Sequence, residues 1–246
     1  MTEARPGSVQ LFTTCLVENL RPQVGLAVLD LLEGQGCAVS CPMGQTCCGQ
    51  PAYNAGCLDD ARAMARRTLS VLARSKDPVV IPSGSCADMI IHRYPEILKN
   101  DPIDAGAARE LAGRTYELSQ FLVGVLKVKE VGARSAGRIT YHASCHLLRG
   151  LGEADSPLQL LATLSGAEMV PLKGAEECCG FGGLFAIKMS DISGAMLQRK
   201  LDHIRASDAQ TVVACDTGCL LHLEGGLRRQ GSAIRVLHLA EALVGT

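Results

Sequence analysis

TCCGQPAYN at residues 46–54 and ECCGFGG at residues 177–183 each contain an adjacent cysteine pair followed by glycine. Further cysteines stand at similar intervals on both sides. In the first copy 31 residues lie between an upstream cysteine and the pair, and 37 between the pair and a downstream one; in the second the intervals are 32 and 39. These outer cysteines are Cys15 and Cys86 in the first copy, and Cys145 and Cys219 in the second. Matching positions are 130, 131 and 133 residues apart, which indicates an internal duplication.

An adjacent cysteine pair favours a metal cluster over a single ion. Neighbouring side chains of an extended chain point to opposite sides, so both thiolates reach one ion only with strain. They more easily reach two irons of one iron–sulfur cluster, and each copy supplies about as many thiolates as such a cluster needs. The glycine after each pair permits positive φ and close backbone approach. The candidate ligands are Cys15, Cys47, Cys48 and Cys86, then Cys145, Cys178, Cys179 and Cys219.

Disulfides and zinc are the alternatives for the 12 cysteines. Residues 1–30 contain no charged-then-apolar signal segment, so a cytoplasmic location is expected, where cysteines more often bind metal than form bridges. The net charge of −1, the absence of Trp and an aromatic content of 3% argue against nucleic-acid binding. No apolar run approaches the roughly 20 residues of a membrane helix, which argues against membrane insertion.

Alternating strand and helix patterns predict an α/β fold with two tandem duplicated domains, each a small, mostly parallel sheet flanked by helices. We expect domains at residues 1–130 and 131–246, with the polar stretch 127–137 as linker. Ligands in such sheets sit beyond the carboxyl ends of the strands, where the outer cysteines are predicted to lie. The predicted strands cover residues 9–13, 37–41, 78–81, 138–141, 169–172 and 211–214. The predicted helices cover residues 22–32, 59–73, 108–127, 157–164, 192–204 and 236–244.

Four motifs carry a family resemblance: residues 46–54, PSGSC at 82–86, YHASCH at 141–146 and residues 177–183. They are similar to the cysteine-rich CCG domain, which occurs twice in one of the subunits of heterodisulfide reductase and in the iron–sulfur subunit of glycolate oxidase. The chain most resembles the lactate utilization protein A family, over about residues 9–243. The resemblance implies a cytoplasmic iron–sulfur protein required to oxidise L-lactate to pyruvate, acting with lactate utilization proteins B and C.

The chain departs from the family's full motif, which ends in CxxC. Ser83 stands where the first cysteine of that pair would be in the first copy, and Asp216 in the second. Cys215 lies one residue early. The heterodisulfide reductase relatives use five cysteines for each non-cubane cluster. Because oxygen ligands are harder donors than thiolate, we hypothesise one four-iron cluster in each copy, with Ser83 or Asp216 near an oxygen-ligated or open iron.

His142 and His146 flank Cys145, and either can be expected to hydrogen-bond a cluster sulfur, to donate a proton, or to be merely structural. Cys37, Cys41 and Cys57 have no counterpart at the repeat offset and are expected to be non-ligating thiols.

The sequence contains no dinucleotide-binding glycine motif, although oxidising a 2-hydroxy acid usually needs a flavin or nicotinamide. We therefore expect an electron-transferring oxidoreductase subunit that is active with partners. A heterodisulfide or thiol reductase subunit and a non-enzymatic zinc or thiol assembly module remain the alternatives.

Overall fold

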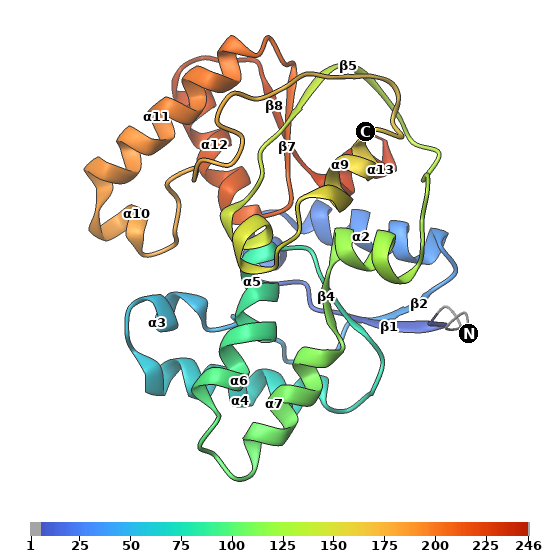
Figure 1. Ribbon diagram of the computed structural model, residues 1–246, viewed down its shortest axis with the longest axis vertical. Helices are drawn as coiled ribbons and strands as arrows, with labels where there is room; N and C mark the ends of the chain where they lie inside the picture. The colour runs from blue at the N-terminus through green and yellow to red at the C-terminus, as the bar shows by residue number, and fades with distance from the viewer. Residues whose placement is uncertain (1–5, 246) are drawn as a thin grey trace. The chain divides into compact units, whose positions relative to one another are not determined.

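The computed structural model describes residues 6–245, and these divide into two compact units, one ending at Val128 and the other beginning at Lys129. Each unit contains a four-stranded sheet in which every neighbouring pair of strands is parallel. The predicted fold class is therefore confirmed: two tandem α/β domains, each with a small parallel sheet flanked by helices (Figure 1).

The sheet of the first unit has the order β2-β1-β3-β4. Its strands are β1 (Ser8–Leu11), β2 (Ala38–Ser40), β3 (Val79–Ile81) and β4 (Thr115–Glu117). The three residues of β3 are all fully buried, as expected for a central strand covered on both faces. The helical segments are α1 (Cys15–Leu20), α2 (Pro22–Gly34), α3 (Gln50–Asn54), α4 (Leu58–Leu72), α5 (Gly84–Asp88), η1 (Met89–Arg93), α6 (Tyr94–Ile97), α7 (Asp104–Gly113), α8 (Leu118–Gln120) and η2 (Phe121–Val125).

The second unit repeats this topology with the order β6-β5-β7-β8. Its strands are β5 (Arg134–Tyr141), β6 (Ser165–Met169), β7 (Thr211–Ala214) and β8 (Arg235–His238). The central strand β7 is again buried along its whole length. The helical segments are η3 (His146–Gly150), α9 (Asp155–Leu161), α10 (Phe185–Lys188), α11 (Ser190–Ala206), α12 (Thr217–Arg229) and α13 (Leu239–Val244).

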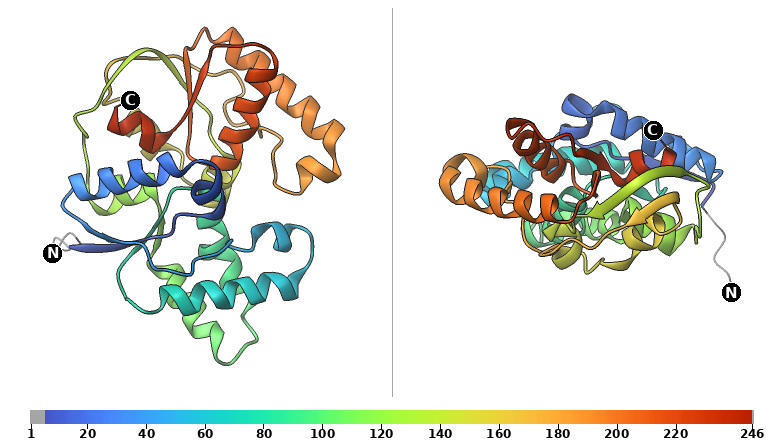
Figure 2. Two further views of the ribbon diagram at one scale, coloured as in Figure 1. Left: turned by 180° about the vertical axis from the view of Figure 1, so that it is seen from behind. Right: turned by 90° about the horizontal axis from the view of Figure 1, so that it is seen from above.

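Helices cover both faces of each sheet. In the second unit α11 packs beside α12, and α9 packs beside α13 on the other face, as the front and rear views show (Figures 1 and 2). In the first unit α4 packs against α6 and α7. The apolar stripe of α4 (Ala61, Ala65, Thr68, Leu69 and Leu72) corresponds position by position to the buried stripe of α11 (Ser193, Leu197, Lys200, Leu201 and Ile204). The cysteine pair of each unit lies before the short helix that precedes this long one, α3 in the first unit and α10 in the second.

The fourth strand of each unit was not predicted, and two predicted helices are wrong there. Residues 108–127 form the end of α7, then β4, α8 and η2 rather than one helix. Residues 236–244 form most of β8 and then α13. At both places a capping box starts a new helix directly after the strand, between Glu117 and Gln120 and between His238 and Glu241. The periodicity of the apolar residues did not reveal these strands of three and four residues.

Smaller differences concern boundaries. Strand β5 begins at Arg134, inside the stretch predicted as linker, and β6 ends at Met169, where a strand was predicted to begin. Cys86 lies beyond the carboxyl end of β3, in α5. Of the helices in the described part of the chain, none combines the length and apolarity that a membrane crossing requires.

Candidate metal centres

The four repeat cysteines of the first unit come together at the carboxyl end of its sheet. Cys15 opens α1 just after β1, Cys47 and Cys48 lie in the loop before α3, and Cys86 lies in α5 after β3. The Sγ atoms of Cys48 and Cys86 are 3.3 Å apart. Hydrogen bonds also link the thiols of Cys15 and Cys47, and those of Cys47 and Cys48. The four sulfurs thus form a continuous series, which we call the first quartet.

The second unit assembles its own quartet in the same way. Cys145 directly precedes η3, Cys178 and Cys179 lie in the loop before α10, and Cys219 lies in the first turn of α12. The Sγ atoms of Cys179 and Cys219 are 3.3 Å apart, the same separation as in the first quartet. Hydrogen bonds join the thiols of Cys145 and Cys178, and those of Cys178 and Cys179. The eight residues predicted as ligands are therefore brought together four by four.

Both quartets concentrate negative charge on the first cysteine of the pair. The neighbouring thiols of Cys15 and Cys48 donate to the sulfur of Cys47, which holds the pKa of Cys47 well below its usual value. Cys145 and Cys179 do the same for Cys178. The backbone amide of Gly180 also donates to the Cys178 sulfur, at 3.4 Å. Since the thiolate is the form that binds metal, each quartet contains one cysteine prepared for metal binding.

The glycine after each pair is required by its backbone conformation and its neighbours. Gly49 has φ 88° and Gly180 has φ 92°, in the left-handed region that side chains disfavour. A Cβ on Gly180 would lie 2.7 Å from the Ser193 carbonyl oxygen, whereas one on Gly49 would lie 3.2 Å from the Cβ of Met64. The loop that carries each pair therefore packs closely against a long helix, α4 in the first unit and α11 in the second.

Thr14, beside Cys15, has a strained backbone. Its φ is 68° and its ψ 149°, a region populated almost only by glycine. Its side chain accepts a hydrogen bond of 3.5 Å from the amide of Val17 and so caps α1. Ser144, at the matching place before Cys145, is not among the described residues with positive φ.

The two residues that replace the missing cysteines begin helices. Asp216 caps α12, because its Oδ1 accepts a hydrogen bond of 3.1 Å from the Gly218 amide. A hydrogen bond to Cys178 and burial raise the pKa of Cys145, burial outweighs a lowering hydrogen bond with Cys179 to raise that of Cys219, and the Asp216 carboxylate adds a smaller part to both. Ser83 stands before α5, and its hydroxyl is 3.1 Å from the Ser85 hydroxyl. Both residues are buried and already have contacts within the protein.

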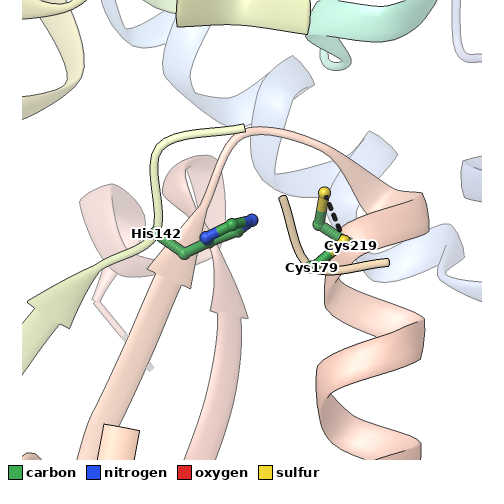
Figure 3. A group of neighbouring side chains, drawn as sticks. All are labelled: His142, Cys179 and Cys219. Atoms are coloured by element: carbon green, nitrogen blue, oxygen red, sulfur yellow. Dashed lines mark hydrogen bonds between the residues drawn. The ribbon is translucent and has the colours of Figure 1, made fainter. Parts of the chain in front are cut away.

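His142 lies beside the second quartet and is completely buried. One of its ring nitrogens and the Sγ atoms of Cys179 and Cys219 lie within 4.8 Å of one another (Figure 3). Burial, and secondly the charge of Lys200, lower the pKa of His142 to about 3, so the imidazole is neutral at physiological pH. The backbone of Ala175 is near enough to oppose this shift slightly, yet neither ring nitrogen has a hydrogen-bond partner in good geometry.

Lys200 is a site residue that the sequence analysis missed. It is fully buried on the stripe of α11, and its Nζ donates to the carbonyls of Gly174 and Ala175 in the loop before the cysteine pair. Burial lowers its pKa, while Glu177 and the thiols of the quartet oppose that shift. A charged residue three positions after Leu197 on an otherwise apolar stripe was the available signal.

The remaining candidates belong to no described group of three metal-ligating side chains with ligand atoms mutually within 4.8 Å. Cys215 is buried with its sulfur 3.6 Å from the hydroxyl of Tyr141. Cys37 is buried near the Pro6 carbonyl, at 3.7 Å. Cys41 and Cys57 are exposed. His146 is the second residue of the pair flanking Cys145, and it is only half-buried in η3.

The donor set fits a polynuclear iron–sulfur group. Among the described residues, the sole group of three metal-ligating side chains with ligand atoms mutually within 4.8 Å is His142, Cys179 and Cys219. Neither quartet therefore packs three sulfurs as closely as a tetrahedral single-ion site would. Each quartet offers four thiol donors that are less closely packed than the ligands of a single ion. A glycine with positive φ follows the cysteine pair in each.

Comparison with known proteins agrees with the duplication. The family of the cysteine-rich domain CCG matches residues 9–91 and 139–224, one match in each unit. Lactate utilization protein A of Geobacillus kaustophilus (strain HTA426) is 49% identical over 96% of this chain and 98% of its own length. The protein of the same name from Halalkalibacterium halodurans is 46% identical over 96% of each chain.

A solved structure shares the fold. The crystal structure of a hypothetical protein from Helicobacter pylori superposes with a TM-score of 0.66 at 12% identity, covering 96% of this chain. The chain spans about half of that protein, 48% of its length. With two CCG matches and near full-length relatives at this identity, the chain belongs to the lactate utilization protein A family of cysteine-rich CCG-domain proteins.

Proposed function

We propose that each quartet holds one iron–sulfur cluster, of the four-iron type, and that the chain is an electron-transferring oxidoreductase subunit in the oxidation of L-lactate to pyruvate. The observation that carries the proposal is the double quartet: four thiols converge in each unit, and in neither do three sulfurs lie mutually within 4.8 Å. The role in lactate utilization is supported by the name of the relatives.

The residues of the chain prepare each site for a soft, anionic group. Cys47 and Cys178 are the thiols most readily ionised, so they would bind metal first. The Gly180 amide donates a hydrogen bond to the Cys178 sulfur, which favours the negatively charged thiolate. Cys86 and Cys219 lie in the first turns of helices, where backbone N–H groups also favour negative charge. When bound, an iron–sulfur cluster supplies one-electron transfer.

Lactate oxidation releases two electrons and two protons, for which enzymes usually use a flavin or nicotinamide. The chain's sequence contains no dinucleotide-binding glycine motif, so we place the first acceptor of these electrons on a partner. Lactate utilization proteins B and C are the proposed partners, and the cytoplasm the proposed location.

The test is metal analysis of the full-length protein purified without oxygen, followed by assay with and without proteins B and C. We expect iron and labile sulfide in each unit and lactate-dependent reduction of an electron acceptor only with the partners. Fewer than about two irons per chain, the content of the smallest cluster, would contradict the cluster assignment. Stoichiometric zinc instead would indicate an assembly module.

Two catalytic outcomes would also change the assignment. Lactate oxidation by the chain alone would overturn the proposed division of labour. Thiol–disulfide turnover without lactate dependence would favour a heterodisulfide reductase-type role.

A further inference from the structure

The second unit buries an imidazole whose ring nitrogens make no hydrogen bond of good geometry. It belongs to His142, which has no exposed surface, and the backbone of Ala175 is near the ring. Buried polar groups in native proteins nearly always have a partner, so such a group points to a ligand. Two neighbours share this condition, because the hydroxyls of Ser144 and Thr217 are buried without partners as well. These positions flank Cys145 and Cys219 in the sequence.

The ring is aimed at the sulfurs of the second quartet. His142 follows the last residue of β5, and its side chain extends from that strand end toward Cys179 in the loop and Cys219 in α12 (Figure 3). The ring nitrogen and the two sulfurs form a triad whose atoms lie mutually within 4.8 Å. Three elements of the unit therefore direct one nitrogen and two sulfurs at a common point.

The first unit lacks this nitrogen. Phe12 follows the last residue of β1, as His142 follows that of β5, and it precedes Cys15 by the same three residues that separate His142 from Cys145. Phe12 is completely buried, like His142. A phenyl ring cannot bind metal, so any ligand role of this position is confined to the second unit.

We propose that His142 is an iron ligand of the cluster in the second unit, bound through a ring nitrogen beside the thiolates of Cys179 and Cys219. This inference rests on the proposed function. Neutral imidazole is the form that binds metal, and histidine replaces cysteine on one iron of Rieske centres. The two clusters then differ in their ligands: four thiolates in the first, and four thiolates with one imidazole in the second. The fifth donor of the second unit is thus His142 rather than Cys215, Asp216 or a cysteine of the relatives' pattern.

The test uses the full chain with 15N-labelled histidine. Iron is loaded during anaerobic expression, and pulsed electron paramagnetic resonance is recorded on reduced and oxidised samples. A one-electron change alters the spin parity of a cluster, so each cluster is paramagnetic in one of the two states. The reference is a Rieske protein labelled in the same way, in which the histidine nitrogens are bound directly to iron.

We expect one of the two signals to show a 15N coupling of the size seen in the Rieske reference. His142→Phe gives this position the residue type of Phe12, its counterpart in the first unit. This substitution should remove the coupling and leave the other signal unchanged. His222→Phe is the matched control: His222 is a half-buried histidine of the same unit that contacts Phe181 and Ser193. It should leave the coupling intact.

The outcomes separate this inference from the proposed function. Protein without iron would overturn both. Protein with iron but without a Rieske-sized coupling would overturn only the ligand assignment, as would a coupling that survives in His142→Phe. Absence of the coupling in the unsubstituted chain overturns the ligand assignment even if His142→Phe fails to fold.

Discussion

The two units place the same four thiols at the end of the same sheet, but the residues around the thiols differ. Gly49 and Gly180 contact Met64 and Met196, and four residues further along each helix stand Thr68 and Lys200. Five of the replacements are Leu11, Phe12, Thr68, Pro82 and Ser83 in the first unit, with Tyr141, His142, Lys200, Cys215 and Asp216 at the matching positions of the second.

The difference shows that the duplication retained the ligands while their surroundings diverged. In the first unit the Tyr94 hydroxyl donates to the carbonyl of Cys48 and accepts from the hydroxyl of Thr68, so the loop with the cysteine pair is held by neutral groups. In the second unit Lys200 holds the corresponding loop with a buried ammonium. Charge near a cluster changes its reduction potential, so the two units are expected to differ in potential even with similar clusters.

The largest effect is expected from removing one cysteine pair at a time. Cys47→Ala with Cys48→Ala, and separately Cys178→Ala with Cys179→Ala, should each lower iron and sulfide to about half, because two of four ligands of one cluster are lost. The signal lost in each variant assigns the two clusters to their units. Cys57→Ala, at an exposed thiol outside the repeat, is the control. Full iron content in either double variant would show that the quartets do not bind independently.

Next in size is the cost of adding a methyl group to the two glycines. Gly180→Ala should destabilise the metal-free chain by about 3 kcal/mol, because it adds backbone strain to a clash with a main-chain oxygen. Gly49→Ala meets looser contacts and should cost about 1–2 kcal/mol. Guanidinium unfolding measures both, with Gly183→Ala as the control, since it has positive φ but no atom within 4 Å of the added Cβ. Equal costs for all three would mean that the packing of these loops is immaterial.

Lys200→Thr gives the second unit the residue that the first unit has at the matching position, Thr68, and removes the buried positive charge. Because that charge stabilises the more negative, reduced cluster, the potential of the second cluster should fall by on the order of 60 mV, a tenfold change in equilibrium constant. Redox titration monitored by paramagnetic resonance gives the value. Lys173→Thr, at an exposed lysine of the same loop, controls for a general charge effect. An equal shift in both variants would remove Lys200 from the explanation.

The smallest effect concerns the residues before the first cysteine of each quartet. Thr14→Gly should raise the free energy of unfolding by up to about 1 kcal/mol, because glycine relieves the strain at φ 68° while a weak cap is lost. Ser144→Gly should lower it by about 0.5–1 kcal/mol, since glycine there only gains freedom in the unfolded chain. Opposite signs in thermal unfolding would confirm that the strain is confined to the first unit. The same sign in both would contradict it.

Much of the fold could be predicted because the cysteine spacing relates positions that are far apart in the sequence. The offset of 130–133 residues predicted two copies, and the strand patterns before Cys15 and Cys145 predicted where the thiols would gather. Strands β4 and β8 were missed because three or four residues give no reliable period, and the helices that follow them extend the apolar pattern.

The surroundings of the quartets were less predictable. His142 and His146 looked equivalent from the sequence, but of the two only the buried His142 belongs to the triad with the sulfurs. Ser83 and Asp216 were predicted near the clusters, and their additional role at the starts of α5 and α12 depends on the backbone. Lys200 was missed because its contacts are with carbonyls of a loop 25 and 26 residues away.

The burial of Lys200 has a practical consequence for chemical labelling. Its amine has no exposed surface and donates to the loop that leads to Cys178. Acylating reagents modify amines that meet water, so the six exposed lysines should react first and Lys200 only when this loop moves away from α11. The rate of its modification, followed by mass spectrometry, therefore reports how often the second sulfur site opens, without any engineered probe.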